Sequence, residues 1–229
     1  KIAVPDVALT NNAGSAHLAG LGTVEGVARA KGEIFAGLGM QGIAVINADD
    51  DHAEQWRELA AGHRTLTFGL DHQADIHATW QPQGYGSRIE VSAQNEKFSA
   101  GLQVPGVHNV RNALAATAAA LALHIPLAAI TAGLNNFGGV VGRLQRKAAL
   151  RGAVLIDETY NAKPASLHAA LEVLARAPGQ KILVLGDMGE LGADAARLHA
   201  EIGAEAHALG IQKLLALGDL STYAVDEFG

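Results

Sequence analysis

Apolar runs and amphipathic segments alternate along the first sixty residues. Val7–Thr10 and residues 42–47 are continuous apolar runs, which are typical of buried strands. Thr23 is placed to cap a helix that we expect to run to about Leu38. Its apolar stripe comprises Val24, Val27, Ile34 and Phe35. A short helix is expected over residues 53–61.

The pattern changes between residues 64 and 104. Four β-rich segments separated by turn residues predict an antiparallel patch, at 65–68, 76–80, 88–91 and 97–100. An alanine-rich helix then follows from Asn109 to about Leu123. Pro126 begins another helix, which is expected to end near Asn135 and Asn136.

The last third of the chain reads β-α-β-α-β. The strands are expected at 153–157, 181–185 and 213–217, and the helices at 164–176 and 194–209. This order predicts a parallel, Rossmann-like arrangement and an α/β fold class overall. We place the domain boundary near Arg146 and Lys147, which gives domains 1–146 and 147–229. The spacing of the glycines at 186–192 differs from the G-x-G-x-x-G pattern of dinucleotide-binding loops, so NAD binding is not expected.

Composition narrows the class of protein. The chain has 229 residues, an apolar fraction of 49%, a charged fraction of 17% and a net charge of -6, which indicates a globular chain and argues against a nucleic-acid partner. The absence of cysteine excludes disulfides and thiolate metal sites and fits a cytoplasmic protein. The apolar run at 113–123 is too short to span a bilayer, so no membrane partner is expected.

Two asparagines at the start of the alanine-rich helix are the most informative residues. Asn109 and Asn112 are three residues apart and therefore share one helix face. A carboxamide both donates and accepts hydrogen bonds, which suits the edge of a purine. The alternative is that Asn109 is only a helix N-cap.

An ordered series of motifs accompanies these asparagines. The motifs are Asn-Asn-Ala-Gly-Ser-Ala-His-Leu at 11–18, Ala-Arg-Ala-Lys-Gly-Glu-Ile-Phe at 28–35, Ile-Asn-Ala-Asp-Asp at 46–50, Gly-Arg-Leu at 142–144, Leu-Ile-Asp-Glu-Thr-Tyr-Asn at 155–161 and Gly-Asp-Met-Gly-Glu-Leu-Gly at 186–192. The series resembles the Mur ligases, which are ATP-dependent amide-bond-forming enzymes of peptidoglycan synthesis. The resemblance covers essentially the whole chain.

The resemblance implies a P-loop-type central ATPase domain followed by part of a Rossmann-like C-terminal domain. The phosphate-binding loop G-x-x-G-K-[ST] of such a domain does not occur in these 229 residues. We therefore expect an internal piece of a longer enzyme, inactive by itself. The implied reaction joins D-alanyl-D-alanine to a UDP-muramoyl-tripeptide, with ATP and Mg²⁺ as cofactors and a monomer as the working form. The alternatives are another Mur ligase, a ligase similar to folylpolyglutamate synthase, or a non-catalytic homologue.

The resemblance also assigns roles around the metal. Lys31 and His17 would be catalytic ligands of Mg²⁺, with Lys31 carrying a carbamate that offers oxygen atoms to the metal. Asn12 would lie near the phosphates. Without the resemblance, Lys31 would be read as a solvated lysine and His17 as a loop histidine. The acidic turn at 49–51 is expected to be solvated rather than a metal site.

The remaining candidates lie near the predicted domain boundary and after it. Arg143 follows a glycine and suits phosphate or a ribose edge, or else an interdomain salt bridge. Asp157 ends a strand, where an acid can accept hydrogen bonds from ribose hydroxyls, or else it is a turn aspartate. The substrate-binding candidates are Asn161, Lys163, Ser166, Asp187 and Glu190.

Overall fold

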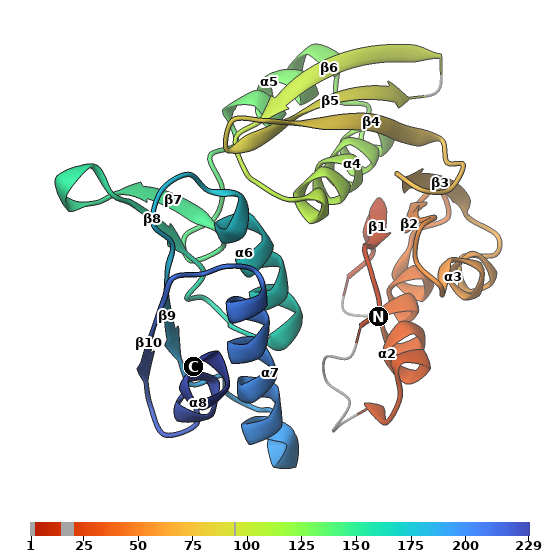
Figure 1. Cartoon of the computed structure of the whole chain (residues 1–229). Coiled ribbons are helices and arrows are strands. Elements are labelled where there is room, and N and C mark those ends of the chain that lie inside the picture. Colours follow the sequence, from red (N-terminus) through yellow and green to blue (C-terminus); the bar gives the residue numbers. More distant parts are fainter. Residues whose placement is uncertain (1–2, 15–20, 94) are drawn as a thin grey trace. The chain divides into compact units, whose positions relative to one another are not determined.

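The computed structural model describes residues 3–14, 21–93 and 95–229, in two compact units (Figure 1). Unit 1 is Lys1–Phe137 and unit 2 is Gly138–Gly229, and each is described by itself. The expected boundary at residues 146–147 falls inside unit 2. The reason is that β7 (Gln145–Ala148) pairs with β8 (Val154–Asp157) of that unit.

Unit 1 is built on a six-stranded sheet with the strands in sequence order. Its strands are β1 (Val7–Thr10), β2 (Ile43–Asn47), β3 (Arg64–Gly69), β4 (Ile76–Gln83), β5 (Gly86–Ala93) and β6 (Glu96–Leu102). Strands β1 to β4 are parallel, and β4, β5 and β6 are antiparallel. The antiparallel patch predicted from residue 64 therefore begins one strand later, because β3 pairs in parallel with the buried β2.

Helices cover both faces of the parallel strands. They are α2 (Val24–Gly32), α3 (Ala53–Leu59), α4 (Val107–Ala122) and α5 (Leu127–Asn136). Strand β2 is buried throughout, with Ile43 and Val45 in the core that contains α4, and Ala44 and Ile46 in the core of α2 and α3. Side chains alternate across a strand, so one short apolar run serves two cores.

The first helix is shorter than expected. The Thr23 hydroxyl accepts a hydrogen bond from the Gly26 N–H at 3.0 Å, which confirms the predicted cap. The α-helix ends at Gly32 and continues as a 3₁₀ turn, η1 (Glu33–Gly37). The change in pitch moves Ile34 out of the predicted apolar stripe, so Phe35 is buried and Ile34 is 45% exposed.

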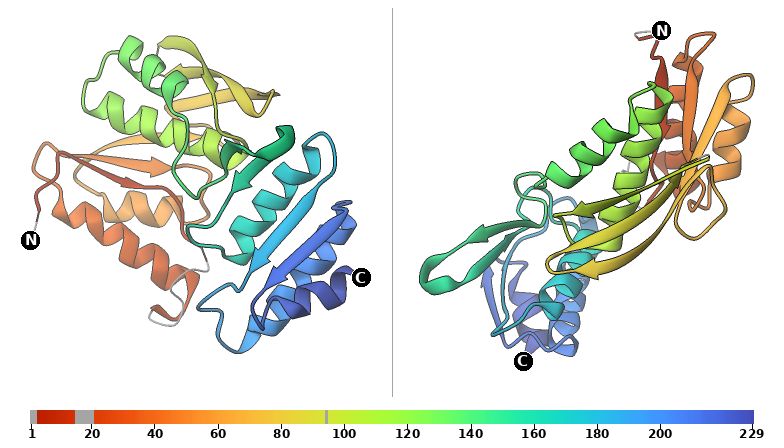
Figure 2. Two further views of the ribbon diagram at one scale, coloured as in Figure 1. Left: turned by 90° about the vertical axis from the view of Figure 1, so that its left-hand side faces the viewer. Right: turned by 90° about the horizontal axis from the view of Figure 1, so that it is seen from above.

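Unit 2 contains a hairpin, a parallel strand pair and three helices. The pair is β9 (Ile182–Gly186) with β10 (Lys213–Leu217), and the helices are α6 (Pro164–Arg176), α7 (Ala195–Ala208) and α8 (Thr222–Phe228). The helices lie on one side of the pair (Figure 2). Strand β8 forms its ladder with β7 in an antiparallel hairpin, so the predicted parallel ladder is present only between β9 and β10. A short 3₁₀ turn, η3 (Gly192–Asp194), precedes α7.

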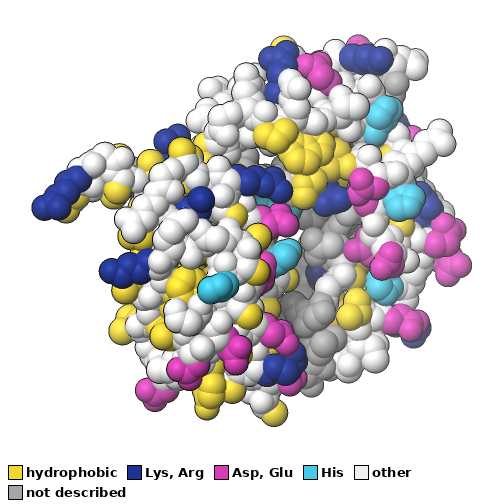
Figure 3. All heavy atoms as spheres, in the orientation of Figure 1, with side chains coloured by type: hydrophobic (Ala, Val, Ile, Leu, Met, Phe, Trp, Pro, Cys, Tyr) yellow, Lys and Arg dark blue, Asp and Glu magenta, His cyan; other side chains and the backbone are white. Residues whose placement is uncertain are grey.

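On the face seen in Figure 3, basic and acidic side chains are interspersed among uncharged ones in both units. In the part of the chain that the structure describes, no helix combines the length and apolarity needed to cross a bilayer.

Two helical glycines differ in the space around them and give a matched test of packing. A Cβ at Gly203 in α7 would lie 2.0 Å from the Ala224 carbonyl oxygen of α8, whereas a Cβ at Gly133 in α5 would meet no atom within 4 Å. We expect Gly203→Ala to lower the free energy of unfolding of unit 2 by about 1–3 kcal/mol through overpacking. Gly133→Ala should instead stabilise unit 1 by roughly 0.5–1 kcal/mol.

Scanning calorimetry measures both changes. Tryptophan fluorescence follows unit 1 separately, because Trp56 and Trp80 both lie there. Equal effects of the two substitutions would contradict the close approach of α7 and α8.

Candidate functional site

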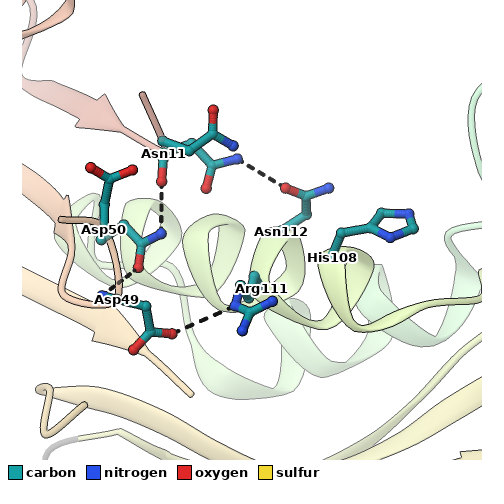
Figure 4. A pocket seen from close by; sticks show the side chains of 8 residues that line it. Asn11, Asp49, Asp50, His108, Arg111 and Asn112 are labelled. Atoms are coloured by element: carbon teal, nitrogen blue, oxygen red, sulfur yellow. Dashed lines mark hydrogen bonds and ion pairs between the residues drawn. The ribbon is translucent and has the colours of Figure 1, made fainter. Parts of the chain in front are cut away.

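Unit 1 contains a polar cavity of about 300 Å³ where β1 and β2 end and α4 begins (Figure 4). Its walls are mainly carboxamides and carboxylates, together with one histidine and one arginine. They are Asn11, Asn12, Asn47, Asp49, Asp50, His108, Arg111 and Asn112. Because β1 and β2 are parallel, their carboxyl ends share one edge of the sheet, where ligands of α/β folds bind.

A chain of carboxamides joins the two strand ends to α4. The buried Asn47 donates from Nδ2 to the Asn11 carbonyl at 2.7 Å, and its Oδ1 accepts from the Asp49 N–H at 3.0 Å. Asn11 in turn donates from Nδ2 to Asn112 Oδ1 at 2.9 Å. The segment after β1 is therefore fixed to the end of β2 and to the start of α4.

The Asp49 carboxylate is the most heavily used group at this edge. It accepts the backbone N–H groups of Leu70 at 2.6 Å, Asp71 at 3.0 Å and His72 at 2.9 Å, and Arg111 Nε lies 3.7 Å away. Burial acts to raise the pKa of Asp49, but the three backbone hydrogen bonds outweigh it and hold that pKa below its usual value. Arg111 also contacts the Asp71 carboxylate at 2.6 Å.

The neighbouring Asp50 is also buried in the fold. Its carboxylate accepts the N–H groups of Ala13 at 2.8 Å and His52 at 2.9 Å. The side chains of Asp49 and Asp50 are only 6% and 7% exposed. The expectation of a solvated acidic turn is therefore wrong for these two residues, which form a buried junction.

The structure brings the two predicted carboxamides together. Asn112 Nδ2 lies 3.4 Å from Asn109 Oδ1, as the three-residue spacing predicted. Asn109 is not the N-cap, because that position belongs to Gly106 with φ +89°. It lies inside the first turn and donates to the Pro105 carbonyl at 2.7 Å. The neighbouring residue His108 has a lowered pKa. Burial is the larger cause, and the charge of Arg111 adds to it.

A second cavity, of about 320 Å³, lies between α4, α5 and the end of β6. Its walls are mostly apolar, and the two carboxamides form part of its lining. The lining residues are Leu102, Val104, Asn109, Asn112, Ala113, Ala116, Thr117, Ala120, Ile130, Gly133, Leu134 and Phe137. Apolar walls with a few convergent hydrogen-bonding groups suit a flat heteroaromatic ring.

Lys31 lies next to the Asn11–Asn12 segment. Its ammonium donates to the Asn12 carbonyl at 2.6 Å, so the two predicted residues are in contact. His17 lies outside the described residues. Among the residues with described positions, no group of three or more His, Asp or Glu side chains is arranged to hold a metal ion. Lys31 in this form is a donor and offers a metal no lone pair.

In unit 2, a tight turn presents Arg143. Its guanidinium carbon lies 4.4 Å from the centroid of the Tyr160 ring, within the range of a cation–π contact. Gly142 has φ +73°, and a Cβ there would lie 3.0 Å from the Tyr160 nitrogen. The Leu144 N–H donates to Glu158 at 2.5 Å. This turn therefore requires glycine, and it is fixed to the end of β8.

Asp157 lies at the end of β8, as predicted. Its carboxylate accepts hydrogen bonds from Lys147 Nζ at 2.5 Å and from the Thr159 hydroxyl at 2.7 Å. Both bonds lower the pKa of Asp157, and the bond from Lys147 has the larger effect. The pKa of the adjacent Glu158 is raised instead. Burial raises it by more than the hydrogen bond from Leu144 lowers it. Glu158 was not among the site residues predicted from the sequence.

The predicted substrate residues meet near the start of α6. Lys163 donates from Nζ to the Gly189 carbonyl at 2.7 Å and to Glu190 at 3.0 Å. Ser166, the third residue of α6, accepts the N–H of the N-cap residue Lys163 at 3.1 Å, as in a capping box. Asn161 is exposed just before this helix.

Asp187 has a structural role in this structure. Its Oδ1 accepts hydrogen bonds from the Ser221 N–H and from the Ser221 hydroxyl, both at 2.7 Å. The pKa of Asp187 is lowered, and the bond from the hydroxyl is the largest cause. A Cβ at Gly218 would lie 2.4 Å from the same carboxylate. The carboxylate therefore fixes the segment that leads into α8.

Four residues of the unit 1 cavity were not predicted from the sequence, namely Asn11, Asn47, Asp49 and Arg111. The positions of Asn47 and Asp49 in the sequence did indicate a site. Asn47 and Asp49 follow a buried strand, and the rule that selected Asp157 at the end of a strand applies to them equally. Arg111 gave no such signal, because its role depends on a contact with a segment forty residues away.

Comparisons with known proteins identify the family of the chain. Residues 1–120 match the Mur ligase middle domain, and residues 142–227 match the glutamate ligase domain of Mur ligases. The chain is 40% identical over 223 residues to the UDP-N-acetylmuramoyl-tripeptide–D-alanyl-D-alanine ligase of Escherichia coli, which covers 95% of this chain and 48% of that protein.

Solved structures show the same architecture. A crystal structure of MurF from Acinetobacter baumannii matches with a TM-score of 0.91 and 35% identity, covering 98% of this chain and 49% of that one. MurF from Thermotoga maritima in complex with ADP matches with a TM-score of 0.78 and 27% identity, covering 97% and 51%. The chain spans about half the length of these relatives.

Two family models thus cover most of the chain, and they divide it close to the place where the two units separate. The chain belongs to the Mur ligase family.

Proposed function

We propose that this chain forms part of an ATP-dependent ligase that joins D-alanyl-D-alanine to a UDP-N-acetylmuramoyl-tripeptide. The carboxamide pair of Asn109 and Asn112 in the lining of an apolar cavity supports the use of a nucleotide most directly. The names of the relatives support the choice of substrates. The enzyme acts in the cytoplasm as a monomer.

The reaction proceeds through an acyl phosphate. A carboxylate oxygen of the tripeptide attacks the γ-phosphorus of ATP, and ADP leaves. The dipeptide ammonium loses one proton to solvent, and the neutral amine then attacks the acyl carbon. The amide bond forms as the nitrogen loses a second proton, and inorganic phosphate leaves with the oxygen that linked it to the acyl carbon and takes up that proton. Charge builds up on the transferring phosphoryl group, so the site needs cations and hydrogen-bond donors there.

The residues of this chain divide these tasks. Asn109 and Asn112 hydrogen-bond the edge of adenine, and Asp157 accepts from ribose hydroxyls. Arg143 pairs with phosphate, since a guanidinium binds oxyanions in a bidentate manner.

The segment after β9 is assigned to the incoming dipeptide. Asp187 and Glu190 receive its ammonium, and Asn161, Lys163 and Ser166 contact the rest of the substrate. Lys163 already contacts Gly189 and Glu190, which brings these candidates into one cluster.

Mg²⁺ is the implied metal, and Lys31 and His17 would hold it. The ammonium of Lys31 does not fit a metal site, because it donates to Asn12 and has no free lone pair. A carbamate on Lys31 would fit, because it supplies the anionic oxygens that Mg²⁺ prefers. When bound, the metal neutralises phosphate charge.

The substrate assignment is tested by replacing the matching segment of the Escherichia coli ligase with this chain. We expect the chimera to release phosphate from ATP only when both the tripeptide substrate and D-alanyl-D-alanine are present. The 229-residue chain alone should release none, because it contains no G-x-x-G-K-[ST] loop to hold the phosphates. Coupled phosphate assays with L-alanyl-L-alanine as the control dipeptide decide the point. A folded chimera that ligates a different amino acid would contradict the substrate assignment.

The same chimera tests Lys31. We expect Lys31→Ala to lower kcat on the order of 10²–10³-fold, by analogy with removing one electrostatic stabiliser of a transition state. Lys31→Arg should not restore turnover, since arginine offers a cation where an anion is needed. Acetate or formate should partly restore activity in Lys31→Ala by supplying a small carboxylate.

Lys97→Ala is the control for this series, because Lys97 is an exposed residue of β6. It should behave like the parent chimera with and without acetate. Near-normal turnover in Lys31→Arg would show that Lys31 is an ordinary charge and that the carbamate is wrong.

A further inference from the structure

His199 is a buried imidazole to which neither the motifs nor the proposed reaction gives a role. It lies in the second turn of α7 and is 0% exposed. Its Nδ1 lies 2.7 Å from the Ala195 carbonyl oxygen, and its Nε2 lies 2.9 Å from the Met188 backbone nitrogen. Both ring nitrogens therefore have a partner inside unit 2.

These partners fix the protonation state of the ring. A carbonyl oxygen only accepts, so Nδ1 must carry the hydrogen. A backbone N–H only donates, so Nε2 must present its lone pair. The ring is therefore the neutral Nδ1–H tautomer, and an imidazolium would direct two N–H groups toward each other at Met188.

The Met188 bond belongs to a set of anchors under the segment after β9. Three consecutive residues are each fixed to a different helix or its start. Asp187 accepts from Ser221 before α8, Met188 donates to His199 of α7, and Gly189 accepts from Lys163 before α6. Two of these three anchors, those made by His199 and Ser221, come from residues that are 0% exposed, and of these two only the His199 anchor holds a backbone N–H of the segment.

The anchored segment carries Glu190, whose side chain is 88% exposed and whose backbone has φ +60°. A non-glycine residue in this conformation costs free energy and persists when its surroundings hold it. Met188, two residues earlier, is 1% exposed. The buried bond to His199 thus fixes the base from which Glu190 projects.

We propose that His199 is a positioning residue that acts through the Met188 N–H to hold the Asp187–Glu190 segment ready for the ammonium group of the dipeptide. The choice of ligand rests on the function proposed above. The anchoring itself rests only on the geometry of unit 2.

Three substitutions separate this role from simple packing. In His199→Gln the side-chain oxygen reaches the position of Nε2 and can accept the Met188 N–H. In His199→Asn the shorter side chain places its oxygen at the position of Nδ1, away from Met188. His199→Leu fills space but accepts nothing.

The first readout uses the ¹⁵N-labelled 229-residue chain. Long-range proton–nitrogen correlations should show a protonated Nδ1 and an unprotonated Nε2 in the parent chain. Exchange protection of the Met188 amide should fall roughly 5- to 150-fold in His199→Asn and His199→Leu, because a buried donor loses its acceptor. His199→Gln should retain most of that protection. An Nε2–H tautomer, or equal protection in the Gln and Asn variants, would overturn the anchoring role.

The second readout is titration with D-alanyl-D-alanine, followed at the Gly189 and Glu190 amides. We expect affinity to fall about fivefold or more in His199→Asn and to be restored in His199→Gln. Adenosine binding, followed at Asn112 in unit 1, should be unchanged in all variants. Unchanged dipeptide affinity in His199→Asn would overturn the positioning role.

If the parent chain itself shows no response of these amides to the dipeptide, the amine site is wrong in both proposals. The tautomer and exchange results then still decide whether His199 anchors the segment. The two failures are therefore distinguishable.

Discussion

The candidate site of unit 1 depends on one buried carboxylate, that of Asp49. Three backbone N–H groups of the segment after β3 point at it, and Arg111 of α4 lies beside it. A buried charge is tolerated only when hydrogen bonds and an opposite charge replace the lost water. Meeting that requirement fixes the end of β2, the segment at residues 70–72 and the first turns of α4 together. Asn112 follows Arg111 on that helix, so the arrangement that satisfies Asp49 also places the carboxamide proposed to contact adenine.

Unit 2 uses the same principle with different groups. At the carboxyl end of β9, Asp187 and the Met188 N–H each find one partner from a separate helix or its start. At the end of β8, Glu158 accepts the Leu144 N–H and holds the turn that carries Arg143. Polar groups that the fold must satisfy thus lie directly beneath the residues proposed to meet ligands. This arrangement gives rigid positions to side chains that would otherwise sample many rotamers.

Local patterns predicted most of the elements but not how they pair. The buried strand β2, helix α6 from Pro164 and the Thr23 cap follow from apolar period, proline position and capping chemistry. The parallel pairing of β3, the hairpin of β7 with β8 and α8 did not follow, because they depend on contacts between distant segments. In the site, the Asn109–Asn112 face followed from helical spacing, whereas Asp49 was misread because an Asp-rich turn has the composition of a solvated one. Only the fold shows that three backbone N–H groups and Arg111 contact this carboxylate.

The most direct test of the nucleotide site in unit 1 is titration of the ¹⁵N-labelled chain with adenosine, which needs no phosphate-binding loop. We expect shifts at the start of α4 and along the cavity between α4 and α5. Asn112→Ala should weaken adenosine binding roughly 5- to 150-fold, the equivalent of about 1–3 kcal/mol for a lost hydrogen-bond partner. Asn136→Ala, at the exposed end of α5, removes a carboxamide of the same size and should leave the affinity unchanged. If Asn112→Ala binds adenosine as well as the parent chain and only melts at a lower temperature, Asn112 is a structural residue and the nucleotide site lies elsewhere.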